Sequence, residues 1–322
     1  MSQACDVLVL LHPSISSVRW LDSLEHKPFT KPQVDKIFDL DRSSQLSIVE
    51  WYTNRGGRPN DEHSIAIKTL SYNDTWIRDY GPLSLKGTDG KISWVNFAFN
   101  GWGGKYASSE DDKVSLRLAS LFEQTIESVP VILEGGALEF ADSDRCMVNP
   151  LCIATPSRAW REDHSNAKGR LCSMLKIKEV IYVPSSALTN DDTDGHIDTI
   201  LRFLPNNLMA VAGPTKGHID YETLSSLRGR ACEISSQLGC SLIELPTPTV
   251  RSAYDGRPLP ATYVNFLCTR QYLFVPTYGV KEDETALKLL TDALPNHKVV
   301  GINCRALVEQ HGSLHCATMN LA

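Results

Sequence analysis

Five stretches of the sequence share one pattern of polar and apolar positions. Each begins with polar or small residues and continues as a strand with alternating apolar side chains, and the first four then turn at a polar cluster into a second strand. Their first residues are Arg78, Glu134, Asp194, Ala261 and His311, so the stretches recur roughly every 60 residues. The recurrence predicts one supersecondary unit that the chain uses about five times.

Helical patterns lie between these stretches. Residues 109–129, 220–239 and 281–296 carry apolar side chains three and four positions apart. A unit of strands plus one helix cannot bury its apolar face alone, so we expect the units to stack, and a ring of five is a closed way to do so. The hairpin openings would then meet at one central site, and a last strand would bring Cys316 into it. The same pattern is compatible with a conventional doubly wound sheet.

No Gly/Ser-rich or Pro-rich linker interrupts the 322 residues, which predicts one compact domain over residues 1–322. Residues 7–11 (VLVLL) follow an acidic residue and have no basic flank. They predict a buried strand rather than a signal peptide, so we expect a cytoplasmic protein. No tract approaches the ~18 apolar residues of a membrane helix, and no membrane contact is expected.

Charge and cysteine content exclude further classes of protein. The net charge of −6 comes without a Lys/Arg cluster, so nucleic acid is not an expected partner. The nine cysteines include no CxxC pair. This argues against a disulfide framework and against a zinc site, and no metal is expected.

Cys316 is the candidate nucleophile of the last stretch. It follows His315, and the small residues Gly312 and Ser313 allow close backbone approach. A thiolate is the strongest nucleophile that this segment could supply, although a buried cysteine in a terminal strand is the commoner interpretation of such a residue. Its place in the recurrence favours the catalytic role.

A histidine and a carboxylate at the third stretch suit acid/base chemistry. In an extended segment His196 and Asp198 would point to the same face. The tetrapeptide GHID occurs again at residues 217–220, but that copy leads into a helical pattern, where Asp220 is expected as an N-cap. The first copy leads into a strand at a hairpin opening, so His196 is preferred. A surface turn is the simpler interpretation of the same segment.

The first two stretches add carboxylates and an aromatic ring. In TWIRDYGP, Asp79 follows Trp76 by three residues, a pair that suits a planar cation through stacking and bidentate hydrogen bonds. Glu134 precedes two glycines and is either a supporting carboxylate or an ordinary turn acid. Asn265 lies in the fourth stretch.

Taken together, the motifs resemble one family. TWIRDYGP, FNGWGGK, LEGGALEF, DDTDGHIDTI, TYVNF and GSLHCATM occur in this order from about residue 75 to the end. The sequence is similar to the agmatine deiminases and Porphyromonas-type peptidylarginine deiminases, a branch of the guanidino-group-modifying enzymes. This resemblance implies a pentein fold, an α/β-propeller with five-fold pseudosymmetry around a central active site.

The resemblance also implies roles for the candidate residues. Cys316 would be the nucleophile, His196 the acid/base, and Asp79 and Asp198 the carboxylates that clamp a guanidinium. Trp76 would line the pocket with Glu134 and Asn265. Neither a metal nor an organic cofactor is implied. The sequence leaves open whether His311 or His315 takes part.

The expected function is therefore hydrolysis of agmatine to N-carbamoylputrescine and ammonia. Alternatives are a deiminase for free or peptidyl arginine, an amidinotransferase, and a non-catalytic pentein that only binds. An arginine carboxylate would call for a pocket arginine, for which the candidates are Arg78, Arg158, Arg251 and Arg257. The expected partners are a small cationic guanidino substrate and, as one option, a second copy of the chain.

Overall fold

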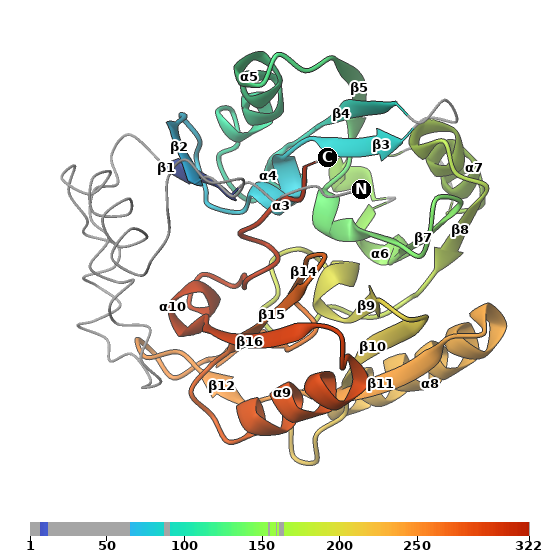
Figure 1. Cartoon of the computed structure of the whole chain (residues 1–322), viewed down its shortest axis with the longest axis vertical. Helices are drawn as coiled ribbons and strands as arrows, with labels where there is room; N and C mark the ends of the chain where they lie inside the picture. The colour runs from blue at the N-terminus through green and yellow to red at the C-terminus, as the bar shows by residue number, and fades with distance from the viewer. Residues whose placement is uncertain are drawn as a thin grey trace.

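The structure is a computed structural model of the whole chain. It describes residues 7–11, 65–86, 91–153, 155–158, 160 and 164–321. Figure 1 shows small sheets placed around the middle of the molecule, with helices on their outer sides. The C-terminal segment runs inward to that middle.

Four sheets share one topology, in which an antiparallel hairpin is followed by a helix and then by a third strand parallel to the second. The first contains β3 (Leu83–Lys86), β4 (Ile92–Ala98), α5 (Val114–Leu121) and β5 (Ile126–Ile132). The second contains β6 (Leu138–Phe140), β7 (Arg145–Val148), α7 (His164–Leu175) and β8 (Glu179–Tyr182). The four hairpins predicted from the sequence are thereby confirmed.

The other two sheets follow the same order. The third contains β9 (Leu201–Leu204), β10 (Leu208–Gly213), α8 (Tyr221–Leu238) and β11 (Ser241–Pro246), and the fourth β14 (Leu267–Cys268), β15 (Tyr272–Thr277), α9 (Glu282–Ala293) and β16 (Lys298–Asn303). Asn206 and Asn207 both have positive φ at the β9–β10 turn, as a type I′ hairpin requires. Gly239 ends α8 in the left-handed conformation. The helices predicted within 220–239 and 281–296 are confirmed.

Short elements complete the described chain. β1 (Val7–Leu11) pairs in parallel with β2 (Ile65–Thr69), so the predicted strand at 7–11 is confirmed. β12 (Val250–Arg251) pairs with β13 (Pro258–Leu259). The short helices are α3 (Ile77–Tyr80), α4 (Gly101–Gly104), α6 (Pro150–Ile153) and α10 (Arg305–Val308), with 3₁₀ turns that include η3 (Asp111–Lys113), η4 (Gly135–Ala137), η5 (Pro156–Arg158) and η6 (Ile197–Thr199).

Three sequence-based expectations were wrong. The helix expected over 109–129 ends with α5, because Glu123 takes a positive φ and the next segment forms β5. The last stretch, from His311, forms turns rather than a strand. The third was wrong only in part: Asp220 is the N-cap residue of α8, as expected, but its carboxylate accepts hydrogen bonds from Thr189 and makes no capping hydrogen bond to the helix.

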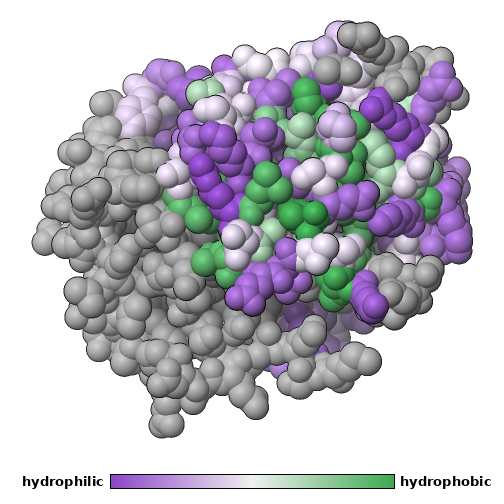
Figure 2. Space-filling view, turned by 90° about the horizontal axis from the view of Figure 1, so that it is seen from above, coloured by the Kyte–Doolittle hydropathy of each residue, from purple (hydrophilic) through white to green (hydrophobic). Residues whose placement is uncertain are grey.

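The buried side chains form three clusters. The largest joins the third and fourth sheets with α8 and α9, and the second lies between the first two sheets and α7. The third contains Trp76, Trp94, Trp102 and Cys316, so the candidate nucleophile lies at the edge of an aromatic cluster. Outside these clusters, Leu116 and Leu121 of α5 stay exposed, and Figure 2, which views the molecule from the side of α5, shows apolar residues among polar ones. Among the described helices, none is long and apolar enough to cross a membrane.

Candidate active site

A cavity of about 300 Å³ lies where α3, α4 and the C-terminal segment meet. Trp76 and Trp102 form apolar walls, and Asp79 and Cys316 lie on the same lining. Both indoles are buried, so an apolar ligand segment between them would lose contact with water. The cavity therefore brings together two of the predicted catalytic residues and the predicted pocket tryptophan.

The Cys316 thiol is held by Asn265. The Asn265 side chain donates from Nδ2 to Sγ over 3.3 Å, and its Oδ1 accepts from the amides of His315 (2.9 Å) and Cys316 (3.3 Å). Burial raises the pKa of Cys316 well above its ordinary value, and the charges of Asp198 and Asp79 raise it further. Its surroundings thus favour the neutral thiol over the thiolate.

His196 lies between two carboxylates. Its Nδ1 is 3.4 Å from Oδ1 of Asp79 and its Nε2 is 3.6 Å from Oε2 of Glu134. Burial alone would lower the pKa of His196, but Asp79 and Glu134 outweigh burial and raise that pKa to about 9. Neither ring nitrogen has a hydrogen-bond partner among the described residues. At neutral pH the imidazole is therefore protonated and can give a proton to a bound group.

Asp79 is fixed by two donors and by a glycine beside it. The Trp102 indole donates to Oδ2 and the Gly136 amide donates to Oδ1, both over 2.9 Å. A Cβ atom on Gly136 would lie 2.6 Å from Oδ1 of Asp79, 2.7 Å from Nδ1 of His196 and 3.3 Å from Oδ2 of Asp198. The three side chains thus surround one point of the backbone of η4.

Asp198 connects this group to the cysteine. Its Oδ2 is 3.9 Å from Sγ of Cys316 and 2.7 Å from Nδ1 of His315. Burial raises the pKa of Asp198 to about 7, with His196 acting in the opposite direction. Burial, together with Arg202 and Arg78, lowers the pKa of His315 well below its usual value. His315 is therefore a neutral donor that orients Asp198, whose Oδ1 has no partner among the described residues.

The local structure around His196 differs from the expected extended segment. Asp194 and Gly195 both have positive φ, so the chain turns sharply and His196 precedes η6. His196 and Asp198 nevertheless face the same site, since both side chains lie beside Gly136.

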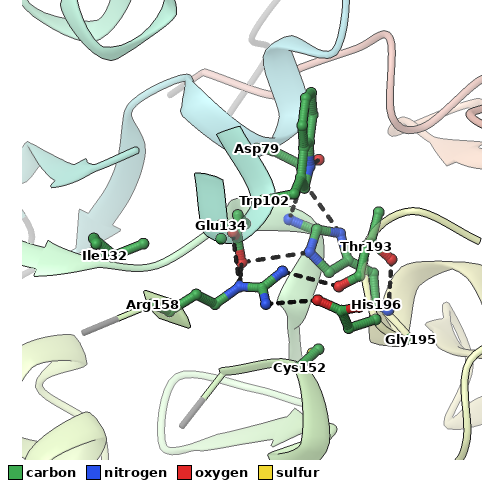
Figure 3. A network of polar contacts seen from close by, with 12 residues as sticks. Asp79, Trp102, Ile132, Glu134, Cys152, Arg158, Thr193, Gly195 and His196 are labelled. Carbon is green, nitrogen blue, oxygen red and sulfur yellow. Dashed lines mark hydrogen bonds and ion pairs between the residues drawn. The ribbon is translucent and has the colours of Figure 1, made fainter. Parts of the chain in front are cut away.

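Figure 3 shows the polar network behind His196. Nε of Arg158 donates to both oxygens of Glu134 at 2.8 Å, while its other nitrogens donate to Asp194 (2.9 Å) and to the carbonyl of Thr193 (3.0 Å). The side chains of Arg158 and Glu134 are fully buried. Arg158 thus fixes Glu134 beside His196, and its buried side chain is not on the lining of the cavity.

The comparisons with known proteins agree with this geometry. A model of the Porphyromonas-type peptidyl-arginine deiminase family matches residues 15–321. The chain belongs to this family. The resemblance inferred from the motifs is thereby confirmed, and the match extends well upstream of the first motif.

Relatives of this deiminase-family chain cover most of it. A Marinomonas sp. protein assigned as an agmatine deiminase is 26% identical over an alignment of 284 positions, which covers 80% of this chain and 76% of that protein. A structure assigned as a Porphyromonas gingivalis arginine deiminase is 30% identical, with a TM-score of 0.78 and coverage of 98% and 96%. A Cys-to-Ser variant of the C. jejuni agmatine deiminase with substrate bound is 28% identical, with a TM-score of 0.76 and coverage of 98% and 93%. The chain has the mixed α/β fold of these enzymes.

Two histidines of this deiminase-family member take different places. His315 lies behind Asp198, as described above. His311 lines the cavity, with Nδ1 2.6 Å from the carbonyl oxygen of Asn190 and 3.3 Å from Asp192. The hydrogen bond to Asp192 raises the pKa of His311. His315 therefore belongs to the side chains around the Cys316 thiol, whereas His311 belongs to the lining of the cavity.

Sequence reasoning assigned no role to Trp102 and only a substrate-reading role to Arg158. The run of glycines in FNGWGGK signals left-handed backbone, and Trp102 itself has φ 56°, which turns its indole toward Asp79. Arg158 carries no local signal, because its partner Glu134 is remote in sequence. In the described part of the chain, no group of three or more His, Cys, Asp or Glu side chains is arranged to hold a metal ion.

Proposed function

We propose that this chain deiminates agmatine, giving N-carbamoylputrescine and ammonia. The observation that carries the proposal is the convergence of Cys316, Asp79, His196 and Asp198, of which Asp79 and Cys316 line a cavity with tryptophan walls and the other two contact them. Two carboxylates can fix a guanidinium through paired hydrogen bonds. The proposal is supported by the family membership and by relatives named as agmatine deiminases.

The bound guanidinium supplies the positive charge that the Cys316 thiol needs to ionise. Burial and the charges of Asp198 and Asp79 hold Cys316 in its neutral form by raising its pKa. A cation bound between those carboxylates cancels their effect, so it lowers the pKa of Cys316 and favours the thiolate. The nucleophile therefore forms mainly when a substrate is present, which protects the thiol from other reagents.

The reaction then proceeds in two halves. Sγ of Cys316 attacks the guanidinium carbon, and protonated His196 gives its proton to the departing nitrogen, which leaves as ammonia. This breaks one C–N bond and leaves an S-alkylthiouronium on the cysteine. Water then attacks the same carbon while neutral His196 takes up one of its protons. Cleavage of the C–S bond releases the ureido product, and the remaining hydroxyl proton passes to sulfur, so Cys316 returns as the neutral thiol.

The negative charge of the cavity lining favours binding of agmatine over binding of arginine. Among the described residues that line it, none is Lys or Arg, whereas five are acidic: Asp74, Asp79, Asp191, Asp192 and Glu309. An arginine carboxylate would meet like charges there, but the ammonium of agmatine would not. Arg257 contacts the lining residue His311, and it is also held by Asp255. This distribution favours a substrate with a cationic distal end.

We also propose that the four repeated sheets belong to a five-unit ring within a single domain. The topology of the four sheets supports this arrangement, and the fifth position would be taken by β1, β2 and the C-terminal segment. The amide of Arg78 donates to the carbonyl of Cys316, so the first motif and the last are joined directly at the site.

The proposed activity is tested by incubating the purified protein with agmatine and assaying ammonia and the ureido product. We expect turnover by the parent chain and a loss of at least about a thousandfold in kcat for Cys316→Ser, because serine is a far weaker nucleophile here. Free arginine and arginyl peptides are assayed in parallel. Equal ammonia release by Cys316→Ser, or a preference for arginine, would overturn the proposal.

A further inference from the structure

Asp74 is a carboxylate of the cavity that the reaction does not use. It lies two residues before Trp76 and lines the cavity together with Asp79 and Cys316. Its backbone is fixed on both sides, since its amide donates to Asp111 and its carbonyl accepts from the hydroxyl of Tyr80. The carboxylate is thus held in place before any ligand arrives.

The other acids of the lining already have partners. Asp79 accepts from Trp102 and Gly136, Asp191 from Thr193 and Gly195, and Asp192 from Tyr106, while Glu309 is paired with Arg305. Asp74 accepts a hydrogen bond at Oδ1 from the amide of the next residue, Thr75, at 2.7 Å. Within the described residues, no cation pairs with this carboxylate. A cationic group of a ligand could therefore form an ion pair with the carboxylate of Asp74.

The electrostatics of Asp74 favour such a ligand. Burial raises the pKa of Asp74, and the negative charges of Asp79 and Asp192 raise it further. Both neighbours line the same cavity as Asp74: Asp79 is the acid that clamps the guanidinium, and Asp192 lies 3.3 Å from His311. A cation beside Asp74 would reduce repulsion among all three carboxylates.

Polar atoms without hydrogen-bond partners lie next to the lining residues Asp79 and Cys316 and indicate where the guanidinium binds. Both ring nitrogens of His196 and Oδ1 of Asp198 are buried without hydrogen-bond partners in the described structure, and buried polar atoms of this kind point to a polar ligand. If the guanidinium lies there, the alkyl chain passes between Trp76 and Trp102, and the far end of the ligand reaches other lining residues.

We propose that the carboxylate of Asp74 binds the distal ammonium of the substrate and so selects guanidines that carry a second positive charge on a short alkyl chain. This inference rests on the proposed function, because it concerns the other end of the same ligand. It assigns Asp74 to substrate selection, whereas Asp79 and Asp198 act on the reacting group.

The test compares agmatine with n-butylguanidine, which has the same chain but no amino group. Asp74→Asn keeps an acceptor for the amide of Thr75 while removing the charge. We expect its KM for agmatine to rise about ten- to a hundredfold, the range of a lost charge-assisted hydrogen bond, with kcat little changed. Its kcat/KM for n-butylguanidine should stay near that of the parent, so the preference for agmatine collapses.

Two further variants complete the design. Asp74→Ser also keeps an acceptor for Thr75, so it provides a neutral replacement should the Asn variant fail to fold. Asp142→Asn, an exposed acid outside the cavity that pairs with Arg145, controls for the loss of one negative charge and should keep the full preference.

The outcomes separate the two proposals. If the parent chain turns over neither guanidine, the proposed function fails. If the parent prefers agmatine and both Asp74 variants keep that preference, the function stands and the role of Asp74 is overturned. Loss of the preference together with retained n-butylguanidine turnover supports the role.

Discussion

Gly136 leaves the space in which Asp79, His196 and Asp198 approach one another. Its replacement by alanine would place a Cβ atom less than 3 Å from both Asp79 and His196. We predict that Gly136→Ala lowers kcat/KM for agmatine about a hundredfold, because displacements of about 1 Å in the clamp have costs of that order. Steady-state kinetics measures the loss. Activity close to that of the parent would show that the clamp tolerates the shift.

The ionisations of Asp198 and His196 predict the pH dependence. The carboxylate of Asp198, with a pKa of about 7, must lose its proton to clamp a cation, and His196, with a pKa of about 9, must keep its own. We therefore expect kcat/KM for agmatine to rise as the pH increases through about 7 and to fall above about 9. These limits belong to the coupled group rather than to single residues.

The variant Glu134→Gln tests whether His196 sets the alkaline limb of this pH profile. In Glu134→Gln one of the two carboxylates that raise the pKa of His196 is gone, so His196 should lose its proton at lower pH. We predict that the alkaline limb of kcat/KM moves toward neutral pH. An alkaline limb that stays in place would mean that a group other than His196 governs it.

The sequence predicted the catalytic residues that lie within short motifs. Asp79, His196, Asp198 and Cys316 each lie in a motif at a predicted hairpin opening or at the last stretch, and the structure brings them together. The ion pair of Arg158 with Glu134 could not be predicted, because it joins residues 24 positions apart through a buried contact that leaves no local pattern.

Among the secondary-structure elements, α8 offers a simple test of local stability. Gly229 lies exposed in the interior of this helix, and a Cβ atom added to it would meet no neighbouring atom within 4 Å beyond the helix backbone. Glycine in a helix interior costs about 1 kcal/mol relative to alanine. We predict that Gly229→Ala raises the free energy of unfolding by roughly that amount, measured by urea denaturation, and leaves kcat/KM unchanged. It also serves as the Gly-to-Ala control for Gly136.

Element types were predictable where apolar periodicity was strong, as in α8 and α9. Element types were not predictable where two elements share one continuous apolar pattern. Here α5 and β5 together fill the stretch that was expected as a single helix. The turn at Glu123 separates them, Pro130 disfavours continuation of a helix, and the β-branched residues Val131 and Ile132 favour a strand. In the described part of the chain no strand pairs with the last segment, and its amides at His315 and Cys316 donate to the side chain of Asn265 instead.

Over the whole molecule, buried polar contacts join sheets that share no strand pairing among the described residues. Arg202 of β9 donates from Nε to Glu139 of β6 at 2.6 Å and from another nitrogen to the carbonyl of Phe266 at 2.9 Å. Burial raises the pKa of Glu139, and Arg202 opposes that rise. The pair thus connects the second and third sheets and the segment that leads into the fourth.

Removal of one partner should therefore destabilise the fold. We predict that Arg202→Met lowers the free energy of unfolding by about 3–5 kcal/mol, because Glu139 would remain buried without its cation. The double variant Arg202→Met/Glu139→Leu should recover much of this loss, since an apolar pair needs no compensation. Urea unfolding of the single and double variants measures both effects, and equal stability of the two would contradict the explanation.

The indole of Trp102 has a consequence for experiments on this chain. It donates to Asp79 and lies with Trp76 on the wall of the same cavity, whereas the other tryptophans of the described chain, Trp94 and Trp160, are not on that lining. Tryptophan emission is sensitive to nearby charge, so a guanidinium beside Asp79 should change the intrinsic fluorescence. Ligand titrations can then be followed optically without a label, even in a Cys316→Ser variant that cannot turn over.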